Sequence, residues 1–171
     1  DTAVGSAAAD RILAGLGTDS IDAAAGDDVI NGGGGLDTLS GGLGLDLFVY
    51  TTLTDAIIGG TSSLPRFERI SDFKVGEDSF DLTTVPLAGS FKTLGAVSAL
   101  TVAGIGSLLN SSNFLANGAA TFTFGSGAPQ RTFIAFNNSV AGYSSTSDAI
   151  VEITGVTYAA NFNSLSQISL V

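Results

Sequence analysis

Apolar and acidic positions recur every nine residues over the first third of the chain. Written in nines from Gly5, the chain reads GSAAADRIL, AGLGTDSID, AAAGDDVIN, GGGGLDTLS and GGLGLDLFV. Every nine has aspartate at its sixth position and an apolar residue at its eighth. These residues are Asp10, Asp19, Asp28, Asp37 and Asp46, and Ile12, Ile21, Ile30, Leu39 and Phe48. A fixed internal period of this kind is typical of repeat architectures.

Each nine combines a turn rich in glycine and alanine with a short apolar segment. One apolar position in nine is too few for the stripe of an amphipathic helix. It fits a very short strand with one inward side chain. Two nines then form one coil of a flat spiral, and stacked coils form two parallel sheets around the apolar column. Such a unit buries its apolar face only by stacking on its neighbours.

The stacked turns place the aspartates on two edges of this spiral. Asp10, Asp28 and Asp46 lie on one, the odd edge, and Asp19 and Asp37 on the other, the even edge. Stacked carboxylates repel one another unless a cation lies between them. Ca²⁺ accepts about six to eight oxygens in flexible geometry, whereas Mg²⁺ retains water and fits less well. Glycine lets a turn adopt positive φ and direct its carbonyls at an ion. A glycine-rich linker and a metal-free roll remain as alternatives.

The nines resemble the RTX nonapeptide G-G-x-G-x-D-x-U-x, a calcium-binding parallel β-roll repeat. The resemblance is close for residues 32–40 and 41–49 and weaker for 14–22 and 23–31, and Gly5–Leu13 keeps only the first glycine. We therefore expect the first coil to lack a full site on that side. The resemblance implies that the five aspartates bind Ca²⁺ together with turn glycines. Those glycines are Gly32, Gly33, Gly35, Gly41, Gly42 and Gly44.

The segment after the repeats, FERISDFKVGEDSFDL from Phe67 to Leu82, resembles the D-x-I-x-D-F-x-x-G-x-D-x-I-D-L segment that follows the last RTX repeat. The resemblance implies a cap on the open end of the roll and makes Glu68 and Asp72 candidate calcium ligands. For Asp78 the favoured reading is a surface charge on a solvated β-hairpin.

The last third again contains β-branched and aromatic runs, which predict strands. They are ATFTF, RTFIAF, DAIVEITGV and an edge strand in SQISLV, and the first two are expected to pair as a hairpin. A short helix is expected within residues 107–115, and Glu152 is expected to face solvent. Strands apolar on both faces indicate a sandwich. The predicted fold is all-β, with a short parallel β-roll (1–50), a connecting and capping β segment (51–82) and a β-sandwich-like C-terminal cap (83–171).

The string RTFIAFNNSVAGYSSTSDAIVEITG is similar to the bluetail C-terminal domain of large bacterial surface proteins. That family lies downstream of RTX repeats, which agrees with the order of segments here. Asn137 and Asp148 flank a loop that offers a further calcium site. An ordinary Asn-rich turn is the favoured alternative.

The amino-acid composition limits the binding partners and the catalytic mechanisms that this chain can have. The 171 residues include 16 acidic and 6 basic side chains, which argues against nucleic acid and favours cations as partners. The chain has no Cys and no His, which removes disulfides, His-dependent catalysis and nearly every zinc site. A carboxylate pair is the remaining catalytic scheme, and we expect no enzyme. No apolar run approaches the roughly 20 residues of a membrane span, and the absence of Met indicates a processed product or a fragment.

These observations predict a non-catalytic calcium-binding C-terminal module of a secreted or cell-surface, S-layer-like protein. The RTX resemblance implies an extracellular location and export by type I secretion machinery, with a signal in residues 158–171. One alternative is the secretion and folding module of an exported enzyme or toxin. The other is a calcium-dependent adhesin or lectin, for which Tyr50, Tyr143 and Tyr158 are candidate exposed aromatics. Self-association through sheet edges is also consistent with the pattern.

Overall fold

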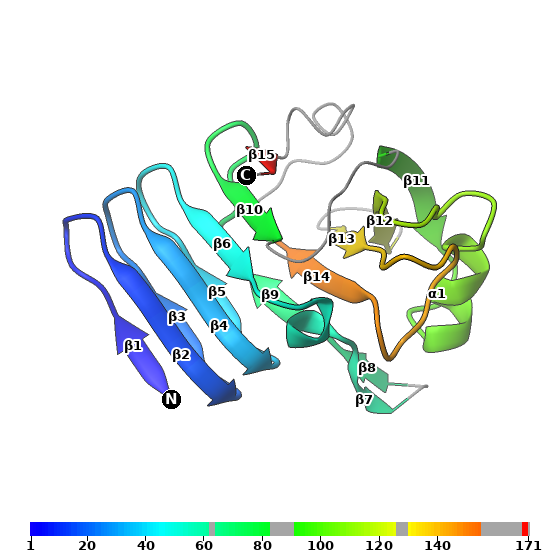
Figure 1. The fold of residues 1–171 in the computed structure, drawn as a ribbon, viewed down its shortest axis with the longest axis horizontal. Coiled ribbons are helices and arrows are strands. Elements are labelled where there is room, and N and C mark those ends of the chain that lie inside the picture. Colours follow the sequence, from blue (N-terminus) through cyan, green and yellow to red (C-terminus); the bar gives the residue numbers. More distant parts are fainter. Residues whose placement is uncertain (62–63, 83–90, 126–129, 155–168, 171) are drawn as a thin grey trace.

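The nine-residue repeats fold into a flat parallel spiral, the coloured stack from blue to cyan in Figure 1. The computed structural model describes residues 1–61, 64–82, 91–125, 130–154 and 169–170. Strands from alternate nines lie in two different sheets, and each pairs in parallel with the strand 18 residues further on. One sheet begins with β1 (Thr2–Val4), β3 (Ser20–Asp22) and β5 (Thr38–Ser40), and the other contains β2 (Arg11–Gly17), β4 (Val29–Gly35) and β6 (Leu47–Tyr50).

The predicted apolar column fills the space between these two sheets. Ile21, Ile30, Leu39 and Phe48 are buried, and Ile12 in the first coil is partly buried. Register places Ile12 opposite Ile30, and Ile30 opposite Phe48. One inward side chain for each short strand is therefore enough, because stacking aligns these side chains into a continuous core. The predicted roll is confirmed.

The segment after the repeats closes the roll at its C-terminal end. A 3-10 helix η1 (Leu53–Ala56) and a hairpin of β7 (Gly59–Thr61) and β8 (Leu64–Arg66) lead into β9 (Glu68–Ile70). Strand β9 pairs with β5 in one sheet, and β10 (Ser79–Leu82) pairs with β6 in the other. The hairpin considered for residues 67–82 is therefore wrong, because its two strands lie in opposite sheets.

Two phenylalanines of this closing segment extend the apolar column. Phe73 and Phe80 are fully buried, and their ring centroids lie 4.8 Å apart. Phe48 of the last repeat is 6.1 Å from Phe73 and 6.2 Å from Phe80. Aromatic rings at these separations interact favourably beyond the area they bury. The predicted capping role of the segment thus has a packing basis.

The C-terminal part continues the first sheet of the roll. Strand β14 (Ala149–Ile153) pairs with β9, followed by β13 (Arg131–Phe136), β12 (Ala119–Phe124) and β11 (Phe91–Val97). Within the described residues this sheet has eight strands. Strand β15 (Ser169–Leu170) pairs with β10 at the edge of the second sheet. The expected β12–β13 hairpin is confirmed by antiparallel register from Ala119↔Phe136 to Phe124↔Arg131.

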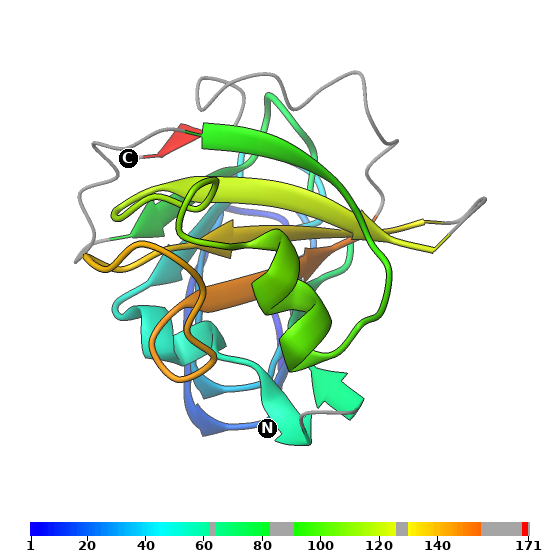
Figure 2. The same ribbon diagram turned by 90° about the vertical axis from the view of Figure 1, so that its right-hand side faces the viewer.

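Both faces of this C-terminal sheet are covered. Ile134, Val151 and Ile153 belong to the core of the roll, whereas Phe122 and Phe133 belong to a second cluster on the opposite face. Helix α1 (Val102–Leu108) lies over this second face (Figure 2) and contributes Ile105 to the cluster. The strands are apolar on both sides for this reason.

Some expectations for the C-terminal part need correction. Helix α1 begins before the predicted range and includes Gly104 and Gly106. Glu152 does not face solvent: it is largely buried and forms a two-point ion pair with Arg131. Among the described residues, no helix has the length and apolar character needed to cross a bilayer. The predicted domain boundaries at residues 50 and 82 remain predictions. Residues 158–168 and 171 of the predicted secretion signal (158–171) lie outside the described residues.

Candidate metal sites at the edges of the roll

Each edge of the roll carries a ladder of carboxylates, one for each coil. In every step, the Oδ1 atom of an aspartate accepts a hydrogen bond from the backbone N–H of the aspartate 18 residues earlier. The donor–acceptor distances are 2.7 Å for Asp10 to Asp28, 2.8 Å for Asp19 to Asp37 and 3.1 Å for Asp28 to Asp46. One oxygen of each carboxylate therefore fixes the register of adjacent coils.

The ladders are longer than the sequence suggested. The amino group of Asp1 donates to Asp19 Oδ1 at the start of the even edge. At the far ends, Asp37 N donates to Glu68 Oε2 (3.4 Å) and Asp46 N donates to Asp78 Oδ1 (3.2 Å). Asp78 is 2% exposed, so the interpretation as a solvated surface charge is wrong. Asp1 lies nine residues before Asp10, in a segment that precedes the first of the five aligned nines.

The second oxygen of the central aspartates has no partner. The Oδ2 atoms of Asp19, Asp28, Asp37 and Asp46 are buried and make no hydrogen bond within the described part of the chain. Burying an acceptor without a partner is costly, and much more so when the group is charged. Four equivalent buried oxygens without a hydrogen-bond partner, at repeated positions, indicate that the two edges bind a ligand.

Glycines form the wall against which these oxygens lie. A Cβ atom added to Gly32 would be 2.3 Å from Asp37 Oδ2, and one added to Gly41 would be 2.2 Å from Asp46 Oδ2. The space beside the free oxygens of Asp37 and Asp46 is therefore open only because their turns begin with glycine. This local arrangement explains why Gly32 and Gly41 belong to the candidate sites.

The other candidate glycines stack directly on carbonyl groups of the preceding coil. Gly33 and Gly35 have φ of +90° and +150°, and an added Cβ would be 1.9 Å from Gly15 O and 1.6 Å from Gly17 O, respectively. Gly42 and Gly44 have φ of +90° and +135°, and their added Cβ would be 2.0 Å from the carbonyl oxygens of Ala24 and Gly26. Backbone oxygens therefore line both edges beside the carboxylates.

The fold disfavours negative charge on the last two carboxyl groups of each ladder. Burial raises the pKa of Asp37 and of Asp46, and the carboxylate one coil earlier raises each pKa further. Burial and the charge of Asp37 raise the pKa of Glu68 to about 8, and burial raises the pKa of Asp78 to about 6. A cation on the edge would offset both effects, because it stabilises the charged carboxylates.

The donor set suits Ca²⁺. Among the described residues, no three His, Cys, Asp or Glu side chains converge on one point. A site on either edge must therefore combine few carboxylate oxygens with backbone carbonyls. Ca²⁺ accepts this mixture in irregular geometry, whereas zinc prefers four nitrogen or sulfur ligands.

Three predicted site residues have other partners. Asp10 Oδ2 accepts from Ser6 N (2.6 Å) and Ser6 Oγ (2.9 Å), so protein groups occupy this oxygen in the first odd turn. Asp72 accepts from Ser40 Oγ and from the Gly41 and Gly42 amides. Glu68 Oε1 accepts from the Tyr50 hydroxyl at 3.0 Å.

Residues outside the roll that were weighed as sites have mainly structural contacts. The two oxygens of Asp148 accept from Asn138 N (3.1 Å) and Ser144 N (2.7 Å), which fits the turn alternative. The Asn137 amide donates to the carbonyls of Phe114 and Leu115. Within the roll, Tyr50 at the end of β6 is buried and is not an exposed aromatic.

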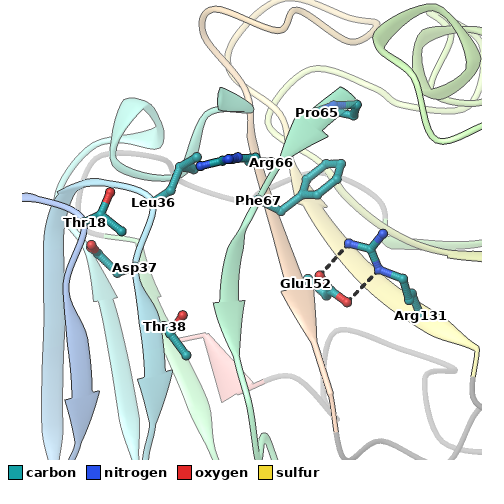
Figure 3. Close-up of a pocket in the computed structure, with 9 residues that line it drawn as sticks. All are labelled: Thr18, Leu36, Asp37, Thr38, Pro65, Arg66, Phe67, Arg131 and Glu152. Carbon is teal, nitrogen blue, oxygen red and sulfur yellow. Dashed lines mark hydrogen bonds and ion pairs between the residues drawn. The ribbon is translucent and has the colours of Figure 1, made fainter. Parts of the chain in front are cut away.

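A pocket of about 300 Å³ lies where the even edge meets the C-terminal sheet (Figure 3). The roll contributes hydroxyl groups and Asp37, and β13 and β14 contribute the Arg131–Glu152 pair, whose guanidinium also lies 5.8 Å from the centre of the Phe67 ring. The lining residues are Thr18, Leu36, Asp37, Thr38, Pro65, Arg66, Phe67, Arg131 and Glu152.

Comparison with known protein families identifies the repeats. Residues 1–30 and 14–48 match the family model of the RTX calcium-binding nonapeptide repeat. The matched range includes both ladders from Asp1 to Asp46. Calcium as the cofactor of these repeats is therefore confirmed, and RTX repeats occur in secreted proteins. No curated protein sequence matched the chain.

Two solved structures share the fold over 99% of this chain. One is the AlgE6R3 subunit of a mannuronan C5-epimerase from Azotobacter vinelandii, with 25% identity, a TM-score of 0.57 and 78% of that chain covered. The other is the AlgE6R2 subunit of the same epimerase, with 20% identity, a TM-score of 0.53 and 92% covered. The predicted all-β fold with an RTX β-roll is confirmed.

Proposed function

We propose that this chain is a non-catalytic module that couples calcium to the folding of an exported protein. The observation that carries the proposal is the repeated buried Oδ2 atom without a partner at Asp19, Asp28, Asp37 and Asp46. The absence of His and Cys and the use of the aspartates in the ladders support a non-catalytic role.

The coupling has a useful size at extracellular calcium concentrations. Calcium sites in extracellular modules have Kd values of about 10⁻⁴–10⁻³ M. At about 1 mM calcium, each site then adds on the order of 0.4–1.4 kcal/mol to the stability of the folded state. The summed contribution of a few such sites is a substantial fraction of the roughly 5–15 kcal/mol that stabilises an ordinary domain. At cytosolic calcium their contribution nearly vanishes.

This calcium dependence suits a chain that is exported unfolded and folds outside the cell. The RTX match supports secretion, and the absence of Cys agrees with a route that forms no disulfides. We extend the proposal to type I secretion and to a cell-surface, S-layer-like location. The bluetail resemblance of the C-terminal sequence supports that location and assembly with partners on the surface.

The proposal is tested by thermal unfolding followed by circular dichroism in excess chelator and in millimolar calcium. Calcium should raise the melting temperature, and magnesium at the same concentration should do so much less. Asp37→Asn should remove part of this increase, whereas Asp22→Asn should not, because Asp22 is exposed and lies outside the ladders. Equal melting temperatures in chelator and calcium would refute the proposal.

A second candidate function is an accessory module of an exported enzyme. It is favoured by the similarity over nearly the whole chain to a subunit of a mannuronan C5-epimerase. The pocket beside Arg66, with its threonine hydroxyls and Phe67, is a surface on which a saccharide could bind. Calorimetric titration with oligomannuronate tests this candidate, and heat that persists in Arg66→Ala would assign binding to another surface.

A further inference from the structure

The last turn of the odd edge, residues 41–46, is closed by a lysine. One coil earlier, the Ala24 carbonyl accepts from Leu43 N (3.0 Å) and lies against Gly42 of the next turn. The equivalent carbonyl of the last turn is that of Gly42, and it accepts from Lys74 Nζ at 2.5 Å. A side-chain ammonium group therefore replaces the backbone of a further coil at this point.

The loop that carries Lys74 also covers the rest of this turn. Asp72 accepts from the amides of Gly41 (3.1 Å) and Gly42 (2.8 Å), and Asp78 accepts from Asp46 N (3.2 Å). The turn therefore has carboxylates on its outer side, in addition to the unpartnered Oδ2 of Asp46. A cation at this position faces a carbonyl oxygen and several negative groups, which is the environment of a metal ion on the same edge.

The ammonium acts electrostatically on this turn. Its charge lowers the pKa of both Asp46 and Asp78, against the larger effect of burial. Its other acidic neighbour, Glu77, is 3.9 Å away and more than half exposed, so that this ion pair is weak. The even edge ends differently, because Glu68 accepts there from the Tyr50 hydroxyl (3.0 Å).

We propose that the Lys74 ammonium is a built-in cation that takes the place of a calcium ion at the last turn of the odd edge. The outer side of this turn, at the Gly42 carbonyl, then closes without metal, because the lysine is tethered and its local concentration does not depend on the medium. The Oδ2 atom of Asp46 stays free for a cation shared with the preceding turn. The inference rests on the proposed calcium binding by the other turns. It predicts that removal of the lysine charge converts the last turn into a further calcium site.

The test compares Lys74→Gln with Lys92→Gln in the full chain. Lys92 is a matched control, since its Nζ also donates to a carbonyl, that of Ser112 (3.3 Å), on the exposed surface of the C-terminal part. In chelator, Lys74→Gln should melt roughly 3–10 °C below Lys92→Gln, because a hydrogen bond from a charged group and a neutralising charge are both lost. In saturating calcium this difference should largely disappear.

A second measurement counts bound calcium by equilibrium dialysis. Lys74→Gln should bind one more ion for each chain than the wild type, and Lys92→Gln should bind the wild-type number. Lys74→Arg keeps the charge and should also bind the wild-type number, which provides a comparison should Lys74→Gln fold only in calcium.

An unchanged calcium count in Lys74→Gln, or an equal loss of stability with and without calcium, would overturn the inference and leave Lys74 as a structural hydrogen-bond donor. These outcomes differ from a failure of the proposed function. A wild-type chain that binds no calcium refutes the proposed function itself, whereas a wild-type chain that binds calcium and gains no ion on loss of Lys74 refutes only the inference.

Discussion

Replacement of Gly33 by alanine tests the close stacking of turns on which the even edge depends. Gly33 has φ of +90°, and an added Cβ would be 1.9 Å from Gly15 O and 2.8 Å from Gly15 C. Gly34, the next residue of the same turn, has no left-handed φ, and its added Cβ would be 3.0 Å from the Leu16 Cδ2 atom. Leu16 is 90% exposed and can move aside. Gly34→Ala is therefore a matched control.

The size of the expected effect has two parts. A left-handed backbone conformation costs an L-residue such as alanine about 1–2 kcal/mol. Relief of the overlap with the Gly15 carbonyl requires two coils to separate, although the paired strands β2 and β4 hold Gly15 opposite Gly33. Overpacking of this kind costs about 1–3 kcal/mol. Together they give roughly 2–5 kcal/mol, which is roughly 4–20 °C in melting temperature for a chain of this length.

Thermal unfolding of both variants in saturating calcium measures the effect, and a calcium titration of each variant accompanies it. Gly33→Ala should melt well below Gly34→Ala, which should stay close to the wild type. The calcium midpoint of Gly33→Ala should also shift to higher concentration, since the displaced Gly15 carbonyl belongs to the same edge as Asp37. Coincident melting curves for the two variants would refute the argument that carbonyl-on-glycine stacking holds the coils together.

Three further predictions concern the buried charges. In chelator, the melting temperature should fall as pH rises through about 6, the raised pKa of Asp78, and then through about 8, the raised pKa of Glu68. Below each of these pKa values the folded state holds the proton more tightly than the unfolded state, so that protonation favours folding. A melting temperature that rises over this pH range would contradict the prediction. Tyr50→Phe should lower stability by about 1–3 kcal/mol in chelator by removing the hydrogen bond to Glu68, and an unchanged denaturation midpoint would contradict a structural role for the hydroxyl. Arg131→Leu should lower the free energy of unfolding by about 2–4 kcal/mol, because it leaves Glu152 largely buried without its cation. Chemical denaturation measures this loss, and Arg131→Lys should recover part of it. Equal stability of Arg131→Leu and the wild type would show that the ion pair contributes little.

The roll could be predicted from sequence because its determinants are local and repeat. A period of nine, one apolar position and one aspartate define the strands, the two edges and the inward column of Ile12 to Phe48. The C-terminal strands were also predictable from β-branched runs, and RTFIAF coincides with β13. Their placement was not, because the pairing of β14 with β9 joins Val151 to Glu68, two residues far apart in the chain. No local pattern encodes that contact.

The residues missed at the candidate sites share a physical reason. Asp78 lies ten residues after Glu68, one more than the nine-residue spacing. The repeat pattern therefore does not mark Asp78, although the fold places it at the end of the odd ladder. Glu152 alternates with apolar neighbours as a surface strand residue would, and only the tertiary contact with Arg131 explains its burial. Both positions are decided by long-range packing, which a single sequence does not report.

The two oxygens of the four central ladder aspartates, Asp19, Asp28, Asp37 and Asp46, have different tasks, and this division links the repeat to its function. Oδ1 accepts the backbone N–H of the preceding coil and fixes register, while Oδ2 has no hydrogen-bond partner and in Asp37 and Asp46 lies against a glycine on the edge. An asparagine could accept the same N–H through its Oδ1 atom, but its NH₂ group would then replace Oδ2 and could not bind a cation. A longer glutamate enters only at Glu68, where the repeat has ended. Aspartate therefore occupies every sixth position because the same short side chain must both hold the coil and leave one charged oxygen for a cation, so that calcium binding and coil stacking stabilise one another.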